Sequence, residues 1–200
     1  MNNAGTPPPA VAGLVLAAGA GRRMGTPKAL VRDAAGVAWV VRTARLLAEA
    51  GCAPVLVVVG AEASRARAAL AGESVEVVEA TDWSEGMSAS LRAGLTQLTA
   101  SAADAVVVVP VDVPGLTVAA VERVTSGAGA DALARATYDG APGHPVVLGR
   151  AHWAGVIASA RGDEGARTYL REHRAAQLEC GDVADGTDID TPANLPPGHH

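Results

Sequence analysis

Short apolar runs alternate with longer helix-like stretches through the first half of the chain, and this order limits the fold more than any other feature. The helix-like stretches cover residues 36–50, 62–71 and 87–99. Four runs rich in Val and bounded by Gly, Pro or Asp have the length of buried strands. They lie at residues 11–17, 54–59, 75–79 and 105–109. This alternation predicts an α/β fold with a mostly parallel sheet between two layers of helices.

After the fourth apolar run the pattern changes. Residues 117–124 are expected to form a helix that begins at a Thr cap. Residues 131–138 and 144–148 are expected to form two strands around a Gly-Pro turn, which adds a small hairpin to the sheet. A further helix is expected at residues 163–173 and a short strand at residues 177–180.

Length and charge favour one compact domain that binds a small ligand. The chain has 200 residues, which suits a single core. We expect a disordered segment at residues 1–10, a domain at residues 11–196, and a tail at residues 197–200 for which a tag remnant is one interpretation. The net charge of −5 is unlike that of a nucleic-acid binder. Because no apolar run is long enough for a membrane span, we expect a cytoplasmic protein.

The loop after the first predicted strand has the composition of a phosphate-binding loop. It contains Gly19, Gly21 and Gly25, then Pro27 and Lys28, and glycines allow successive N–H groups to form a nest for an anion. The spacing fits neither the GxGxxG dinucleotide motif nor a Walker A loop. Lys28 is the only lysine beside fifteen arginines, and its compact charge suits a triphosphate. A solvated loop is the alternative interpretation.

Aspartates mark two further segments. Asp112 follows the fourth predicted strand, where a carboxylate either holds Mg²⁺ together with substrate phosphates or begins a turn. Asp188 and Asp190 precede Thr191 and Pro192, a pair that is also typical of a helix start. From the residues alone, each segment keeps both interpretations.

Three other polar side chains have an equally simple structural explanation. Ser88 and Ser90 begin a predicted helix, where hydroxyls either cap the helix or face a ligand bound at its free N–H groups. His144 stands in the predicted turn of the hairpin, and by itself it indicates a structural histidine.

The loop resembles the signature loop of the molybdenum cofactor nucleotidyltransferases, through Leu16-Ala17-Ala18-Gly19, Arg23-Met24-Gly25 and Pro27-Lys28. The similarity extends from Val11 to Leu195 and is closest to the cytidylyltransferase branch. It implies a three-layer, Rossmann-like nucleotidyltransferase fold, a bound nucleoside triphosphate, Mg²⁺ and a molybdopterin-type acceptor. The nucleotide-binding residues that it implies are Leu16, Ala17, Ala18, Gly19, Gly21, Arg22, Arg23, Met24, Gly25, Lys28, Ser88 and Ser90.

The resemblance also assigns the chemistry. It implies Arg22, Lys28, Asp112 and Asp190 as catalytic residues, with Asp112 and Asp190 as metal ligands and Asp188 as a further candidate. It implies an acceptor site at Gly143, His144, Pro145, Glu164, Gly165 and Arg167. A molybdoenzyme maturation protein is a further candidate partner.

The implied reaction is attack by the terminal phosphate of the acceptor on the α-phosphorus of the triphosphate, with release of pyrophosphate. A phosphate monoester has its second pKa at about 6, so that the nucleophile is already ionised and no strong base is required. A guanylyltransferase, a sugar-1-phosphate nucleotidyltransferase and a non-catalytic nucleotide-binding module remain alternatives. We expect CTP to be preferred over GTP, because Ala18 stands where the guanylyltransferases typically have a second glycine.

Overall fold

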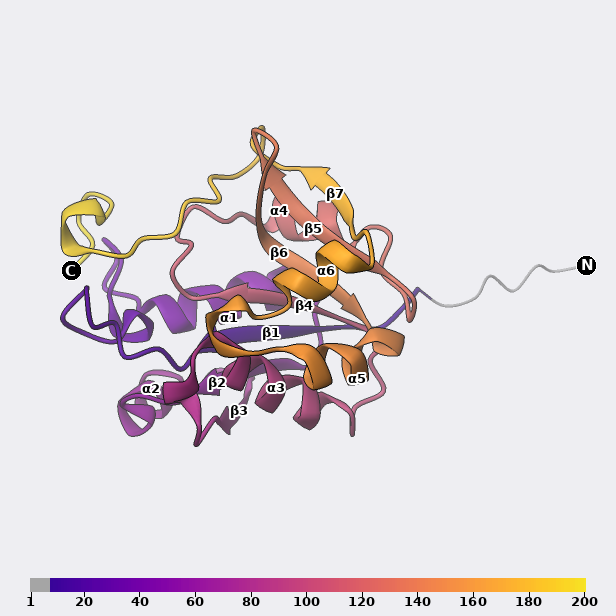
Figure 1. Cartoon of the computed structure of the whole chain (residues 1–200). Helices are drawn as coiled ribbons and strands as arrows, with labels where there is room; N and C mark the ends of the chain where they lie inside the picture. Colours follow the sequence, from indigo (N-terminus) through magenta and orange to yellow (C-terminus); the bar gives the residue numbers. More distant parts are fainter. Residues whose placement is uncertain (1–7) are drawn as a thin grey trace, which may run out of the picture.

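The computed structural model describes residues 8–200, which form one sheet covered by helices on both faces (Figure 1). The strand order in this sheet is β3-β2-β1-β4-β6-β5-β7. The strands are β1 (Val11–Ala17), β2 (Val55–Val59), β3 (Glu76–Glu79), β4 (Ala105–Pro110), β5 (Leu133–Tyr138), β6 (Ala141–Gly149) and β7 (Ala176–Glu179). Most of the disordered segment expected at residues 1–10 lies outside the described residues.

The sheet is parallel except at β6. Strand β1 pairs in parallel with β2 and β4, β2 pairs in parallel with β3, and β5 pairs in parallel with β7. Strand β6 runs antiparallel to both β4 and β5. The predicted fold class is therefore confirmed, and the predicted hairpin of β5 and β6 forms part of the sheet.

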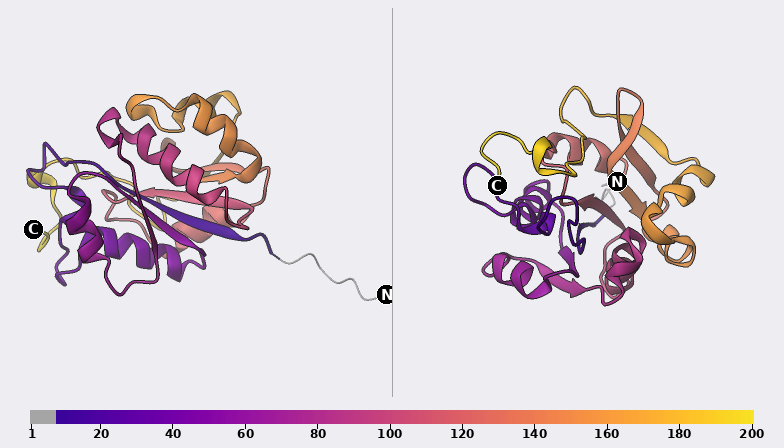
Figure 2. Two further views of the ribbon diagram at one scale, coloured as in Figure 1. Left: turned by 90° about the horizontal axis from the view of Figure 1, so that it is seen from below. Right: turned by 60° about the vertical axis from the view of Figure 1, so that its left-hand side comes forward.

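Helices form the two outer layers (Figure 2). One layer contains α1 (Trp39–Glu49), α2 (Ala63–Ala69) and α4 (Val118–Thr125). The other contains α3 (Met87–Leu98), α5 (Arg150–Ser159) and α6 (Arg167–Glu172). Short 3₁₀ helices, η1 (Lys28–Leu30), η2 (Trp83–Glu85), η3 (Gly162–Glu164) and η4 (Pro192–Asn194), lie in the connections. Within the described residues, no helix has the length and apolar content needed to cross a bilayer.

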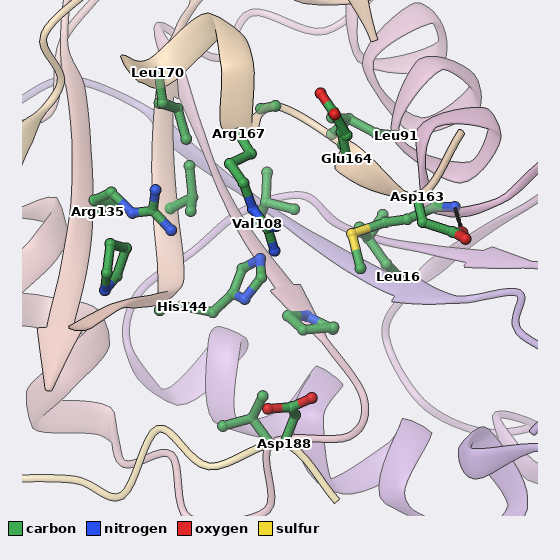
Figure 3. A pocket seen from close by; sticks show the side chains of 18 of the residues that line it. Leu16, Leu91, Val108, Arg135, His144, Asp163, Glu164, Arg167, Leu170 and Asp188 are labelled. Atoms are coloured by element: carbon green, nitrogen blue, oxygen red, sulfur yellow. Dashed lines mark hydrogen bonds between the residues drawn. The ribbon is translucent and has the colours of Figure 1, made fainter. Parts of the chain in front are cut away.

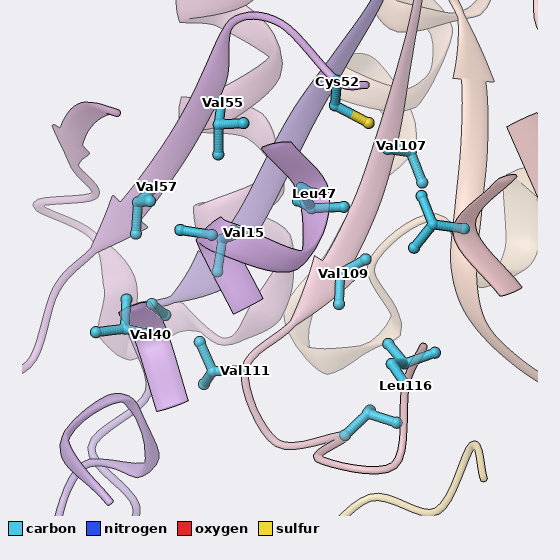
Figure 4. Packing of buried hydrophobic residues seen from close by; sticks show 14 of the residues in the cluster. Val15, Val40, Leu47, Cys52, Val55, Val57, Val107, Val109, Val111 and Leu116 are labelled. Atoms are coloured by element: carbon cyan, nitrogen blue, oxygen red, sulfur yellow. The ribbon is translucent and has the colours of Figure 1, made fainter. Parts of the chain in front are cut away.

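The central strands β1, β2 and β4 contribute side chains to two hydrophobic cores, one on each face of the sheet. Val15 and Val57 pack in the core beneath α1, α2 and α4 (Figure 4). Leu14 and Leu56, their neighbours in sequence, pack on the opposite face beneath α3, α5 and α6. Because both faces are buried, the strands appear in the sequence as continuous apolar runs rather than as an alternating pattern.

The hairpin turn differs from the prediction. The chain turns at Asp139 and Gly140, whose φ angles are 50° and 77°, and two left-handed residues suit the twist of a two-residue hairpin. Residues 141–143, which we had predicted to be part of the turn, belong to β6.

Two helices also differ. The helix predicted at residues 163–173 is divided by Gly165, which has a φ of 55°, into η3 and the short α6. Helix α5 was not predicted at all. Trp153 and Val156 are its buried residues, but Ala and Ile also occupy its other faces, so that no clear helical periodicity marks it.

The topology brings two loops together at one edge of the sheet. From β1 the chain passes to β2 and β3 on one side, and β4 then returns to the other side of β1. Leu16 and Pro110 are paired at the carboxyl ends of β1 and β4. Open α/β sheets bind ligands at such a switch point.

Candidate functional site

An ion-paired cluster lies at the carboxyl ends of β1 and β4. Lys28 Nζ lies 2.7 Å from Asp112 Oδ2 and 2.6 Å from Asp190 Oδ1. Arg23 Nη2 lies 2.9 Å from the other oxygen of Asp190. We call Lys28, Asp112 and Asp190 the Lys28 cluster. Three of the predicted catalytic residues, far apart in sequence, therefore meet at one nitrogen.

The Lys28 cluster is only partly open to solvent. The side chains of Lys28, Asp112 and Asp190 are 16%, 21% and 31% exposed, whereas that of Arg23 is 73% exposed. Burial alone would lower the pKa of Lys28, but hydrogen bonds and charges from the two aspartates raise it above its usual value. The hydrogen bond from Lys28 holds the pKa of Asp190 below its usual range. Lys28 and Asp190 are therefore both charged at neutral pH.

A small hydrophobic cluster anchors the carboxyl-terminal segment beside the carboxyl ends of β1 and β4. Ile189 N–H donates to the carbonyl of Asp112 (2.8 Å). The Ile189 side chain is buried with Met24, Val31 and Trp39, a group that we call the Ile189 cluster. Asp188 and Asp190 flank this anchored residue, so that apolar packing fixes where their carboxylates lie.

The glycine loop is tightly wound. The amides of Met24 and Gly25 both donate to the carbonyl of Gly21 (2.9 Å each). Gly21 has a φ of 60°, and a Cβ atom there would collide with the carbonyl of Thr26. Within the described part of the chain, the amides of residues 19–23 donate to no protein acceptor. An anion would therefore be held by these amides rather than by those of Met24 and Gly25.

Two adjoining hollows meet at the Lys28 cluster. The larger, which we call the loop pocket, has a volume of about 640 Å³. Predicted residues line much of it: Leu16, Ala18, Gly19, Gly21, Arg22, Arg23, Lys28, Ser90, Asp112, Asp188 and Asp190.

The smaller hollow, which we call the inner pocket, has a volume of about 220 Å³ (Figure 3). The predicted acceptor residues that line it are Gly143, His144, Glu164, Gly165 and Arg167. Asp112, Asp188 and Arg167 line both pockets, so that a ligand in one would face a ligand in the other.

Five predicted contact residues do not line the pocket in which we expected them. Ala17 and Met24 are buried in hydrophobic clusters, and Gly25 and Pro145 lie outside the linings. Ser88 is fully buried and its Oγ accepts the N–H of Gly165 (3.1 Å). The prediction that the Ser88 hydroxyl faces the nucleotide is therefore wrong. The hydroxyl instead accepts a hydrogen bond from the loop that precedes α6.

His144 has an unusual environment in the inner pocket. Its carbonyl accepts the hydroxyl of Tyr138 (2.7 Å). Burial, and secondly the charge of Arg135, lower the pKa of His144 to about 4, while Asp188 opposes the shift. Its imidazole is therefore neutral at physiological pH and offers hydrogen bonds without a positive charge.

Arg135 and Asp163 also line the inner pocket but were not predicted as site residues. Arg135 is a charged residue in the middle of the predicted strand, between Ala134 and Ala136, and this was the available signal. Asp163 is the first residue of the helix predicted at residues 163–173, a position where aspartate is typical of a cap. Its Oδ1 accepts the amide of Met87 at the start of α3 (3.2 Å). Asp163 therefore caps α3 rather than the helix that follows it in the sequence.

The donor set of the Lys28 cluster fits a divalent cation that is shared with phosphates. Within residues 8–200, no three His, Cys, Asp or Glu side chains come together as a complete metal site. Two carboxylates meet at one ammonium instead, and Mg²⁺ is usually held by one or two carboxylates with phosphates and water. Asp112 and Asp190 would hold such a cation if Lys28 turned toward the phosphates.

Comparison with known proteins identifies the family. Residues 13–177 match the model of the MobA-like NTP transferase domain. The chain belongs to the MobA-like NTP transferase family. It is accordingly an enzyme of the nucleotidyltransferase class.

The relatives of this family member agree in length and fold. A nicotine blue oxidoreductase of Paenarthrobacter nicotinovorans is 34% identical over 193 residues, which cover 92% of this chain and 93% of that protein. Rv0371c of Mycobacterium tuberculosis is 28% identical with a TM-score of 0.78, covering 92% of this chain and 94% of its own. A structure of Rv0371c in complex with manganese is 26% identical with a TM-score of 0.74, covering 92% and 95%.

Proposed function

We propose that this member of the family transfers CMP from CTP to a molybdopterin-type cofactor with release of pyrophosphate, using Mg²⁺, in the cytoplasm. The observation that carries the proposal is the convergence of Asp112 and Asp190 on Lys28 at the meeting point of two pockets. Residues 11–196 would form the catalytic domain. A molybdoenzyme maturation protein would receive the product.

Each pocket has its own task in this proposal. The free amides of residues 19–23, with Arg22 and Arg23, would hold the triphosphate in the loop pocket. The inner pocket would hold the acceptor, with its terminal phosphate directed toward the Lys28 cluster at Asp112.

Lys28 and the two aspartates would carry the charge changes of the reaction. A divalent cation on Asp112 and Asp190 would neutralise phosphate charge when bound. Lys28 would turn from the carboxylates to the phosphates and stabilise the negative charge that leaves with pyrophosphate. The acceptor phosphate is largely ionised at neutral pH, so that His144 is not required as a base.

The test is a matrix of the four nucleoside triphosphates against candidate acceptors, with pyrophosphate release as the readout. We expect release with CTP and a molybdopterin-type acceptor, and loss of it in Asp112→Asn. Asp131→Asn, a surface change outside both pockets, is the matched control. Release with sugar phosphates alone would move the protein to another acceptor class, and greater use of GTP would favour the guanylyltransferase alternative.

The base preference needs its own comparison. The Ala18 side chain narrows the place where the backbone meets the nucleotide, and a methyl-sized difference is worth about 1–3 kcal/mol. In direct competition at equal concentrations we expect CTP to be used in preference to GTP. Ala18→Gly should raise the share of GTP. An unchanged ratio in this variant would remove Ala18 as the determinant.

The oxidoreductase relative favours a second candidate function, an oxidoreductase reaction. Its identity of 34% covers almost all of this chain. The two candidate functions differ in their need for Asp112 and Asp190, because a hydride transfer requires no divalent cation bound between these carboxylates and phosphates. Oxidation of a reduced pyridine nucleotide by wild-type protein and by Asp112→Asn alike, without pyrophosphate release, would establish this second function.

A further inference from the structure

Arg135 holds a charge in the inner pocket that the protein does not neutralise. It projects from β5, where it pairs with Val146 of β6 and Gln177 of β7. Its Nε is buried and has no hydrogen-bond partner within the described residues. A buried donor left unsatisfied destabilises the free protein, so that such a group calls for a functional explanation.

A second guanidinium lies close by. Arg167, at the start of α6, lines the same pocket, and within residues 8–200 neither arginine forms an ion pair with a carboxylate. Burial lowers the pKa of Arg135, and the charge of Arg167 adds to this effect. His144, which lines the same pocket, is neutral at physiological pH. Two like charges therefore face one space, and neither guanidinium is paired with a carboxylate of the described residues.

Three of the four carboxylates that line the inner pocket, those of Asp112, Asp163 and Glu164, accept hydrogen bonds from groups other than the two arginines. Asp163 accepts the amide of Met87 (3.2 Å), and Glu164 accepts the hydroxyl of Thr168 (2.8 Å). Figure 3 shows both acids on the side of the pocket away from Arg135, and Asp188 apart from them near His144. The remaining lining includes apolar side chains of Leu16, Leu91, Val108, Leu148 and Leu170.

We propose that Arg135 and Arg167 form a second anion subsite, which binds an anionic group of the acceptor other than the phosphate that reacts at the Lys28 cluster. The subsite takes a carboxylate or a phosphate, because the planar guanidinium matches both. The apolar lining takes the body of the same molecule. That the occupant is an acceptor rests on the proposed function, whereas the anion subsite itself rests on the two arginines.

A ligand role and a structural role of Arg135 differ in their effect on stability. If Arg135 serves the ligand, its burial is a cost to the free protein, and Arg135→Gln should leave the melting temperature unchanged or raise it. If Arg135 serves the fold, the same change should lower the melting temperature. Arg42→Gln is the matched control, because Arg42 is also half-buried and lines neither pocket.

The binding test follows the Nε–H signals of arginine by ¹⁵N NMR on the whole protein. Inorganic phosphate and malonate are the two probes, each titrated at constant ionic strength with and without saturating CTP and Mg²⁺. Missing signals in Arg135→Gln, Arg167→Gln and Arg42→Gln assign the three residues. We expect the Arg135 and Arg167 signals to shift with at least one probe, and Arg135→Gln to weaken that binding at least about tenfold.

The outcomes separate this inference from the proposed function. A response to phosphate alone or to malonate alone supports the subsite and identifies its chemistry. No shift of Arg135 with either probe, or an equal shift of Arg42, overturns the subsite, even if CTP binds and reacts. If CTP and Mg²⁺ do not bind, the proposed function fails while the shift of Arg135 still decides the subsite.

Discussion

Replacing Lys28 by alanine should tighten metal binding and slow catalysis at the same time. In the free protein a cation that binds both aspartates must displace Lys28 Nζ from its hydrogen bonds to Asp112 Oδ2 (2.7 Å) and Asp190 Oδ1 (2.6 Å). A hydrogen bond between charged groups is worth about 1.5–3 kcal/mol, and partial exposure reduces this through solvent screening. Because about 1.4 kcal/mol is a factor of ten in Kd, we expect Lys28→Ala to bind Mn²⁺ about tenfold more tightly than the wild type without nucleotide.

The assay is the electron paramagnetic resonance signal of free Mn²⁺ during titration of nucleotide-free protein, followed by pyrophosphate release on the same samples. Arg23→Ala is the control, since Arg23 touches Asp190 from a largely exposed position, and its Mn²⁺ affinity should change by no more than about twofold. Equal or weaker Mn²⁺ binding by Lys28→Ala would refute the idea that the ammonium competes with the metal. Full turnover by this variant would refute its role toward phosphate.

Three further predictions test other parts of the site. Asp112→Asn and Asp190→Asn should each lower pyrophosphate release more than about tenfold at saturating Mg²⁺, with the milder loss in Asp190→Asn if Asp188 replaces it; unchanged release would exclude either as a ligand. Ser88→Ala should leave the amide of Gly165 unsatisfied and lower the free energy of unfolding by about 1–3 kcal/mol, as measured by urea denaturation. His144 has a pKa of about 4 in the folded protein and of 6.5 in the unfolded chain, so that between these pH values only the unfolded state binds the proton. The free energy of unfolding must therefore fall as the pH drops from 6.5 to 4, by up to about 3 kcal/mol. His144→Gln should make the free energy of unfolding less dependent on pH in this range.

The central sheet could be predicted from the sequence because its strands are buried on both faces. Runs such as that of β2 contain nothing but apolar side chains, and this leaves few other structures for them. The second half of the chain, which is less regular, was harder to predict. Its turn at Asp139 and Gly140 depends on two left-handed residues in succession, and α5 packs apolar residues without a helical period.

The site was predictable where it depends on loops at strand ends, and less so where it depends on packing. Lys28 and Asp112 follow strands whose ends are visible in the sequence. The roles of Ser88 and Met24 are decided by neighbours that are distant in sequence, Gly165 and Ile189, which no local pattern reveals. Arg135 was missed for a related reason, since its significance lies in the absence of a partner within the described residues.

The Ile189 cluster has a consequence for the order in which the protein becomes active during its synthesis. Asp190 contacts Lys28 across a separation of 162 residues, and the apolar anchor beside it joins the loop only when Ile189 reaches Met24, Val31 and Trp39. Domains begin to fold while the ribosome is still adding residues, so that strands β1 to β4 can pair on the nascent chain before Asp190 has been added. If Asp190 holds the cation as proposed, a nascent chain that lacks it would not turn over nucleotide, and catalysis would begin only after residue 190 has left the ribosome.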